Sequence, residues 1–278
     1  MDKRTVQAGT TVVFTATVTN ATNPTYRWCR RQVGDTSCVE IVGATRLTYQ
    51  LGGATSADDS ATFQITVSAD NGLAFARVVL LVSAMPPVTH SDGEFLDADW
   101  ALTAEVDPAQ DGPTHTGTRQ TTGGNPGAYR LHTFDLPQAP SSVRLYYVAL
   151  PATYDPAVEG AIRSLDFAED CLGSAGQPVQ PLIEQGGRRY TANVDVTTLC
   201  SSASWETVRR ASLEADQFRL VAGPACGAGE SCPDFSAAGA PLSLGYSAFV
   251  SISSAPPPGT TAHYTFGIDN WQATVWKR

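Results

Sequence analysis

Carboxylate side chains are the residues of this chain that come nearest to a catalytic pattern. The richest group contains Asp166, Glu169 and Asp170, and glycoside hydrolases use a pair of carboxyl groups as acid and as base or nucleophile. On a regular strand Asp166 and Asp170 share one face about 13 Å apart, beyond the roughly 5–9.5 Å that such a pair spans. Glu169 points to the other face, and Glu159 lies outside the group. A hydrolase that uses Glu159, Asp166 and Glu169 is therefore an alternative hypothesis, and the main hypothesis is a protein without catalytic residues.

The sequence lacks the motifs that mark other common catalytic sites. It contains no G-x-S-x-G, no HExxH, no phosphate-binding P-loop and no glycine-rich dinucleotide fingerprint. His132 and His263 stand singly in strand-like contexts, where a histidine is more often a structural group than a general base. We therefore expect a binding or structural function rather than an enzymatic one.

Aromatic rings are the residues that could bind a sugar without catalysis. A ring can lie against the apolar face of a pyranose while neighbouring amides and carboxylates bind its hydroxyls. Trp205 follows a polar stretch, and Trp276 is out of phase with the apolar positions of the last predicted strand. Tyr129 and Tyr154 lie beside predicted loops or on alternate strand faces. We predict four ligand-binding residues: Tyr129, Tyr154, Trp205 and Trp276. The alternative for each ring is packing in the core, and a contiguous exposed patch would distinguish the two.

The elements that position these side chains are predicted to be β-strands. Val12, Phe14 and Ala16 alternate with residues of the opposite face, which is the period of a half-buried strand. The same alternation recurs over residues 61–67, 76–82, 143–149 and 242–250. Short strands separated by Gly, Pro, Asn and Asp are typical of β-sandwiches. Residues 204–213 are predicted as a short helical turn between strands, and the predicted fold class is all-β.

Residues 83–87 mark the boundary between two predicted domains. A strand ends there and Pro86 and Pro87 follow, which cannot continue a hydrogen-bonded ladder. Residues 1–85 carry seven basic and six acidic residues, whereas residues 86–278 carry eleven and twenty-one. The net charge of −9 therefore belongs to the second domain, and it argues against a nucleic-acid partner, which requires a basic surface. No apolar run reaches the roughly 18–20 residues that span a bilayer, so we expect no membrane insertion.

Six cysteines predict an oxidising, extracellular location. Their number is even, and the chain around them is rich in Thr, Ser and Gly. Fifteen pairings are open to six cysteines, and three remain if the first two pair within their own domain. We favour the pairing of nearest neighbours: Cys29 with Cys38, Cys171 with Cys200, and Cys226 with Cys232. The alternative is a metal site, but no CxxC pair occurs and the four histidines are scattered.

The first domain resembles an immunoglobulin-like sandwich. Trp28 stands at the position of that family's strand-C tryptophan, and DSATFQI at residues 59–65 is similar to its D-x-A-x-Y-x-C stretch. Ala16 and Ile65 occupy the two positions where the family carries its inter-sheet disulfide, and Phe63 replaces its corner tyrosine. Such modules in bacterial secreted proteins serve as spacers, so the resemblance implies no chemistry for this domain.

The second domain resembles a galactose-binding-like jelly roll, the architecture of many carbohydrate-binding modules. DGEFLDADW at residues 92–100 and FGIDNWQATV at residues 266–275 are similar to that family's opening and closing strands. The resemblance implies that Trp100 and Trp271 lie in the core. Together the two resemblances imply an immunoglobulin-like β-sandwich, residues 1–85, followed by a larger jelly-roll β-sandwich, residues 86–278.

The jelly-roll resemblance also implies a structural calcium ion, because acidic residues of the first and last strands often hold one in that family. Calcium takes six to eight oxygen ligands. Asp269 matches the closing acidic position, but Leu96 stands where the opening strand of the family has Glu. The predicted metal ligands are Asp92, Asp97, Asp99 and Asp269. Without calcium, these residues are expected to form turns near strand ends.

These observations predict a secreted or surface-attached bacterial protein whose second domain recognises a polysaccharide or surface glycan without catalysis. The first alternative is a structural subunit of an extracellular fibre or surface layer, which would associate with itself through a large interface. The second alternative is the polysaccharide-acting hydrolase described above. Self-association at micromolar concentration would favour the structural subunit over a monomeric binding module.

Overall fold

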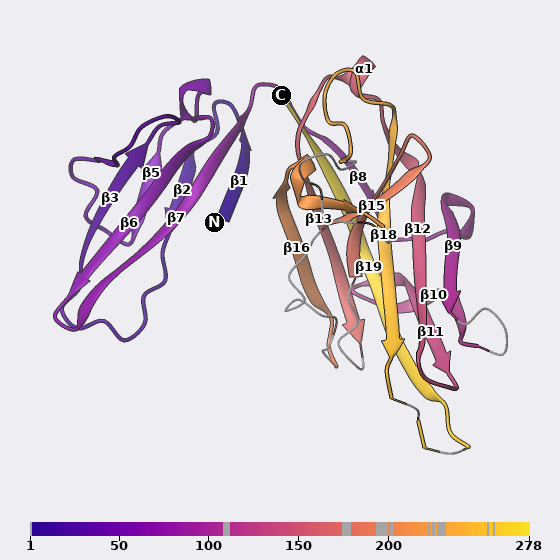
Figure 1. Cartoon of the computed structure of the whole chain (residues 1–278). Coiled ribbons are helices and arrows are strands. Elements are labelled where there is room, and N and C mark those ends of the chain that lie inside the picture. Colours follow the sequence, from indigo (N-terminus) through magenta and orange to yellow (C-terminus); the bar gives the residue numbers. More distant parts are fainter. Residues whose placement is uncertain are drawn as a thin grey trace. The chain divides into compact units, whose positions relative to one another are not determined.

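The computed structural model describes residues 2–107, 112–173, 179–192, 200, 203–221, 223, 226, 232–254, 256–257 and 259–278. Nearly all of its regular structure is β-strand (Figure 1), which confirms the all-β class that the alternation of the sequence predicts. The chain divides into two compact units, residues 1–87 with 276–278 and residues 88–275. No helix within the described ranges is long and apolar enough to cross a membrane.

The first unit consists of two sheets that enclose an aromatic core. Its elements are β1 (Asp2–Gln7), β2 (Val12–Thr15), β3 (Thr25–Arg31), β4 (Val39–Glu40), β5 (Thr48–Leu51), the short helix η1 (Ser56–Asp58), β6 (Ala61–Ala69) and β7 (Gly72–Ser83). One sheet has the order β1-β7-β6-β3-β4, with β1 parallel to β7, and the other pairs β2 with β5. Trp28 of β3 packs against Phe14 of β2 and Tyr49 of β5. Ile65 lies opposite Trp28 in the ladder, so an aliphatic side chain occupies this part of the core.

The second unit is a larger sandwich of two sheets with six strands each. Its elements are β8 (Val88–Asp92), η2 (Asp97–Asp99), β9 (Trp100–Asp107), β10 (Thr114–Gly124), β11 (Gly127–Leu136), β12 (Ser141–Tyr154), α1 (Pro156–Glu159), β13 (Ile162–Gly173), β14 (Val179–Gln185), β15 (Arg188–Ala192), β16 (Glu206–Leu213), η3 (Ala215–Gln217), β17 (Phe218–Leu220), β18 (Leu242–Ile252) and β19 (Ala262–Lys277). The sheet that we call the β19 sheet has the order β10-β11-β19-β13-β16, and β8 also pairs with β19. The β18 sheet has the order β17-β15-β14-β18-β12-β9.

The core of the second unit lies between the inner faces of these two sheets, and the alternation of buried residues tells which side chains point outward. On β11 every second residue from Ala128 to Leu136 is buried, so Tyr129 points away from the core. On β12, Leu145 and Tyr147 belong to the main hydrophobic cluster, whereas Tyr146 belongs to a separate cluster on the other face of the sheet.

Two predictions about local structure have different outcomes. The helical turn predicted for residues 204–213 is wrong, because residues 206–213 form β16, which pairs antiparallel with β13 and buries Val208 and Leu213. The ladder with β13 therefore outweighs the local helical preference. The predicted nearest-neighbour disulfides are confirmed: Cys29–Cys38, Cys171–Cys200 and Cys226–Cys232.

Candidate functional site

Tyr129 and Trp205 form an aromatic pair on the outer face of the β19 sheet. Tyr129 lies on β11 and Trp205 immediately precedes β16, so the fold brings together two rings from distant parts of the chain. The ring centroids are 5.3 Å apart at an interplanar angle of 81°, and both side chains are partly exposed. The Trp205 indole N–H donates to the carbonyl of Gly123 at 3.1 Å. Two of the four predicted ligand-binding rings therefore lie in one place.

The aromatic pair rests on Gly267 of β19. A Cβ atom added to Gly267 would lie 2.9 Å from the Trp205 ring and 3.0 Å from the Tyr129 ring. Both distances are shorter than the separation at which carbon atoms attract one another. Any larger residue at this position would push the rings away from the sheet, so glycine lets them lie against the backbone of β19.

A network of one carboxylate and several amide and hydroxyl groups adjoins the aromatic pair. Asp170 of β13 accepts hydrogen bonds from three side chains, namely Thr207 at 2.5 Å, Asn270 at 2.8 Å and Asn125 at 3.1 Å. Asn125 follows directly after β10, and Gly123, which binds Trp205, lies two residues earlier. One hairpin therefore holds both the rings and the network, which we call the Asp170 network.

Asp269 of β19 binds the turn of the β10–β11 hairpin, which contains Asn125. Its buried carboxylate accepts hydrogen bonds from the backbone N–H groups of Asn125 and Asn270. Burial raises the pKa of Asp269 above its usual range, and the two N–H donors partly offset that rise. The residue that matches the closing acidic position of the jelly-roll family thus fixes the position of Asn125 here.

A hollow of about 360 Å³ opens beside the Asp170 network. Its lining includes Asp170, Thr207 and Asn270 of the network, together with Arg209 and Gln272. Ligand cavities in proteins commonly measure about 300–1,000 Å³. The site therefore combines an aromatic surface, a set of hydrogen-bonding side chains and a space large enough for one ring-sized ligand.

Glu169 also lines this hollow, and it is a buried carboxyl group with 4% of its surface exposed. Burial raises the pKa of Glu169 to about 7, while the positive charge of Arg210 lowers it and the negative charge of Asp170 raises it further. Near neutral pH Glu169 is therefore partly protonated. In the protonated form its carboxyl group can donate a hydrogen bond as well as accept one.

Three of the carboxylates predicted to bind calcium accept hydrogen bonds from N–H groups of the protein. Asp92 accepts hydrogen bonds from the backbone N–H groups of residues 94 and 95 at 2.8 Å and 3.0 Å, and from the Trp100 indole at 2.5 Å. Asp97 forms an ion pair with Arg130 at 2.5 Å, and Asp269 is occupied as described above. Within the described ranges, no three His, Cys, Asp or Glu side chains are grouped to hold a metal ion. Calcium binding by Asp92, Asp97, Asp99 and Asp269 therefore remains a prediction.

The three carboxylates of the hydrolase hypothesis form local contacts with different elements. Glu159 of α1 accepts a hydrogen bond from the backbone N–H of Asp155 at 3.1 Å. Asp166 accepts one from the backbone N–H of Ser212 in β16 at 2.5 Å. Glu169 is the buried residue of the hollow. No catalytic pair of carboxyl groups is therefore assigned.

Tyr154 is not a surface ring, contrary to the prediction. The side chain is 1% exposed, and its hydroxyl donates to the carbonyl of Gly160 at 2.7 Å. The pairing of β12 with β18 is shifted between Val148 and Thr153, and such a bulge reverses which residues face the core. Burial raises the pKa of Tyr154 to about 12, as expected for a phenol inside the protein.

The tryptophans outside the aromatic pair have other positions. Trp276 lies on β19 and groups with the first unit, and its role in ligand binding remains a prediction. Trp100 and Trp271 lie in the core of the second unit, with ring centroids 5.2 Å apart. Asn125 and Thr207, which complete the Asp170 network, are not predicted from the sequence. The only signal for them is the Gly-Gly-Asn turn at residues 123–125.

No described protein family matches this sequence, and no curated protein matches it. Among solved structures, the chain is similar to the family 11 carbohydrate-binding module of the cellulosomal cellulase Lic26A-Cel5E of Clostridium thermocellum, with a TM-score of 0.40, 13% identity, and coverage of 69% of this chain and 95% of that chain. It is similar to TmCBM61 in complex with β-1,4-galactotriose, with a TM-score of 0.31, 9% identity, and coverage of 65% and 90%. It is also similar to the N-terminal four Ig domains of Dscam1 isoform 1.9, with a TM-score of 0.27, 16% identity, and coverage of 49% and 39%. Because these TM-scores and identities are low, function is inferred from the geometry of this chain.

Proposed function

We propose that the second unit binds a neutral polysaccharide at the Tyr129–Trp205 pair and the adjoining hollow, without catalysis. The observation that carries this proposal is the position of the pair beside the Asp170 network on one face of the β19 sheet. An aromatic surface next to carboxylate and amide groups is the combination that a sugar ring requires. The rings offer apolar area to its C–H face, and the polar groups bind its hydroxyls.

The Asp170 network keeps hydrogen-bonding capacity for a ligand. A carboxylate has about four acceptor positions, and Asp170 uses three of them within the network. Asn270 donates both of its amide hydrogens, to Asp170 and to the carbonyl of Asn125 at 2.6 Å, so its side-chain carbonyl is left to accept. Arg209 adds a charged donor to the lining of the hollow. Sugar hydroxyls both donate and accept hydrogen bonds, so they match a site that offers acceptors on Asp170 and Asn270 and a donor on Arg209.

The setting of the site supports an extracellular binding module. Three disulfides are suited to an oxidising compartment. Glu159 and Asp166 each accept a hydrogen bond from a backbone N–H of a different element, and no contact joins them as a catalytic pair in the part of the chain that the structure describes. The ligand class follows from the stacking surface, because a ring face recognises the C–H groups of a sugar and needs no charge on it.

Substitution of the two rings tests the proposal. The wild-type protein, Trp205→Ala and Tyr129→Ala are compared by affinity electrophoresis in gels that contain soluble neutral polysaccharides, followed by calorimetry with each polymer that retards the wild type. We expect each variant to bind at least about tenfold more weakly, as for other central aromatic contacts. Phe75→Ala is the matched control, because it removes a ring that is 61% exposed in the first unit, and it should leave binding unchanged.

Two results would contradict the proposal. If Trp205→Ala and the wild type bind one polysaccharide equally well, the binding site lies elsewhere. If the wild-type protein binds nothing in a broad panel while its thermal unfolding shows that it is folded, the second unit is not a neutral-glycan module. That second result would favour the structural subunit of a fibre or surface layer.

A further inference from the structure

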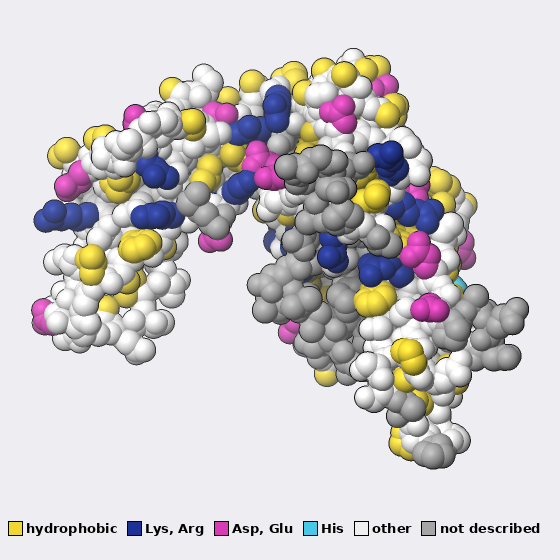
Figure 2. Space-filling view, in the orientation of Figure 1, with side chains coloured by type: hydrophobic (Ala, Val, Ile, Leu, Met, Phe, Trp, Pro, Cys, Tyr) yellow, Lys and Arg dark blue, Asp and Glu magenta, His cyan; other side chains and the backbone are white. Residues whose placement is uncertain are grey.

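A second polar surface lies on the outer face of the β18 sheet, and it is independent of the Trp205 site. Arg144 of β12 points outward because it alternates with the core residue Leu145. Leu182 belongs to the small hydrophobic cluster on the outer face of the β18 sheet, together with Tyr146. Arg219 lies in the same cross-strand row, because Leu182 pairs with Thr191 and Thr191 pairs with Arg219, so Arg219 also points outward. Figure 2 shows Lys and Arg side chains gathered on the face of the second unit that carries β12 and β18 in Figure 1.

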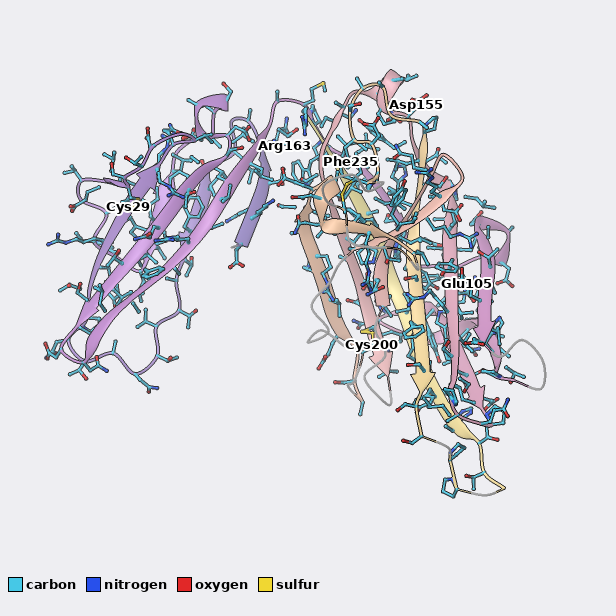
Figure 3. All side chains as sticks on the ribbon, in the orientation of Figure 1. Cys29, Glu105, Asp155, Arg163, Cys200 and Phe235 are labelled. Carbon is cyan, nitrogen blue, oxygen red and sulfur yellow. A yellow bond between two sulfur atoms is a disulfide. The ribbon has the colours of Figure 1, made fainter. Side chains whose placement is uncertain are left out.

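Two guanidinium groups of this face lie over aromatic rings. The Arg144 guanidinium is 4.3 Å from the ring centre of Phe249, and the Arg189 guanidinium is 4.7 Å from the ring centre of Tyr146. Glu105, which is labelled in Figure 3, lies on the edge strand β9 and accepts a hydrogen bond from the Tyr146 hydroxyl at 2.7 Å. A guanidinium that contacts a ring through a cation–π interaction can still donate its N–H groups to other partners.

One of these arginines already has a carboxylate partner, and two do not. Arg189 donates to Glu184 at 2.5 Å, and both side chains are about one-third exposed. In the part of the chain that the structure describes, neither Arg144 nor Arg219 forms an ion pair. Both remain partly exposed. Glu105 attracts Arg144 without forming an ion pair with it, so both guanidinium groups can still bind an anion from outside.

Several side chains at the centre of this outer face are buried, although the outer face of a two-layer sandwich normally contacts water. Tyr146, Val148 and Leu182 form a separate hydrophobic cluster there. Ser247 and Gln180 continue the row of Tyr146 across β18 and β14, and they are only 1% and 8% exposed. The Ser247 hydroxyl oxygen and the Gln180 side-chain carbonyl oxygen have no hydrogen-bond partner in the described structure. Solvent does not reach either atom, so a ligand on this face would contact the partly exposed arginines instead.

The charge of this face is opposite to that of its domain. Residues 86–278 contain twenty-one acidic and eleven basic residues. The outer face of the β18 sheet, in contrast, carries the three arginines described above and only two of the glutamates, Glu105 and Glu184. Burial lowers the pKa of Arg144, whereas Tyr146 and Glu105 raise it, and the nearby charge of Arg219 lowers it to a smaller extent. Arg144 is thus partly desolvated and repelled by Arg219, although Glu105 attracts it. An anion near both guanidinium groups would reduce this repulsion.

We propose that the outer face of the β18 sheet binds a polysaccharide that carries carboxylate groups, such as a chain of uronic acids. A planar guanidinium edge matches a planar carboxylate through two parallel hydrogen bonds. The partly exposed guanidinium groups of Arg144 and Arg219 are the groups that such a chain would contact. The five strands from β12 to β17, at about 4.8 Å spacing, span a width of several sugars. Nucleic acid carries about one negative charge per 1.7 Å, so the acidic remainder of the domain would repel it more strongly than a uronic-acid chain.

The test compares two polymers that differ only in charge. Calorimetry at low ionic strength measures the binding of polygalacturonate and of its methyl ester to the full-length protein. We expect the wild type to bind polygalacturonate, to lose this binding with the ester, and to bind more weakly as salt is added. Arg144→Gln and Arg219→Gln should each weaken binding about tenfold, the usual effect of losing a charged hydrogen bond. The control Arg46→Gln removes the same charge from an exposed arginine of the first unit and should leave binding unchanged.

Four results would overturn this proposal. Equal binding of polygalacturonate and its ester would show that carboxylates are not recognised, and equal binding of dextran sulfate would show attraction to any polyanion. Unchanged affinity in Arg144→Gln and Arg219→Gln, with both variants folded, would exclude this face. If Trp205→Ala loses polygalacturonate binding and Arg144→Gln does not, the binding site for acidic glycans lies on the β19 sheet. The neutral-glycan proposal can fail separately, since Trp205→Ala should leave polygalacturonate binding intact.

Discussion

Glu169 is expected to make the second unit less stable as the pH rises, and Glu169→Gln should remove this effect. Burial raises the pKa of Glu169 from 4.5 to about 7 in the folded protein. Between these two values the unfolded chain releases the proton while the folded protein retains it, so the free energy of unfolding decreases as the pH increases. A pKa change of this size corresponds to about 3 kcal/mol, and the loss is complete once the pH exceeds the folded pKa.

The assay is urea unfolding of the wild type and Glu169→Gln at intervals from about pH 4.5 to about pH 8. Glutamine has nearly the same shape as protonated glutamate but does not ionise. The stability of the variant relative to the wild type should therefore increase by about 3 kcal/mol over this range, or by about 6–12 °C in Tm for a unit of this size. Glu206→Gln, on the neighbouring strand and exposed, is the matched control and should show no such trend.

A stability difference that does not change with pH would refute the reasoning from burial. It would mean that the folded protein holds Glu169 in its charged form, as a dominant attraction from Arg210 would do. If the stability of Glu169→Gln relative to the wild type increases as the pH falls, the pKa of Glu169 is lowered by folding, not raised. If Glu169→Gln does not fold, a carboxyl titration of wild-type Glu169 by NMR measures the same pKa directly.

Two further predictions concern the interior of the second unit. Burial lowers the pKa of His132 from 6.5 to about 3, so the unfolded chain binds a proton below pH 6.5 that the folded protein excludes, and stability should fall by about 3 kcal/mol by about pH 4. His132→Phe should lose this acid sensitivity in thermal unfolding at a series of pH values, and equal sensitivity in both proteins would disprove it. Replacing Cys171 and Cys200 together with Ser should lower the free energy of urea unfolding by about 3 kcal/mol, because their disulfide closes a loop with a separation of 29 residues. A loss within experimental error would show that the unfolded chain is not constrained by this loop.

Local periodicity was sufficient to predict the class of fold, because a strand that is buried on one face must alternate whatever its partners are. It could not predict the face of Tyr154, since the shift in the pairing of β12 that reverses its direction arises from the neighbouring strand. Residues 204–213 show the same limit. Their tendency to form a turn of helix is local, whereas the ladder with β13 that makes most of them a strand connects distant segments.

The candidate sites were predictable only in part for the same reason. Trp205 could be identified as exposed from its polar neighbours, but its contact with Tyr129 depends on the order of strands in the β19 sheet. The arginines of the β18 sheet gave no sequence signal at all, because residues 144, 189 and 219 lie on three strands separated by long segments. The sequence also could not show that Asp92 and Asp97 bind Trp100 and Arg130, because these partners come from other segments of the second unit.

The hydrogen bond from the Trp205 indole to Gly123 has a consequence for affinity. Sugars bind weakly, and a protein that must first order a loose side chain spends about 0.5–1.5 kcal/mol on each one. Here the ring is already fixed at one end by its N–H group and supported below by Gly267. For the proposed glycan, Trp205 is therefore a preorganised contact, and binding to its ring would cost little side-chain entropy.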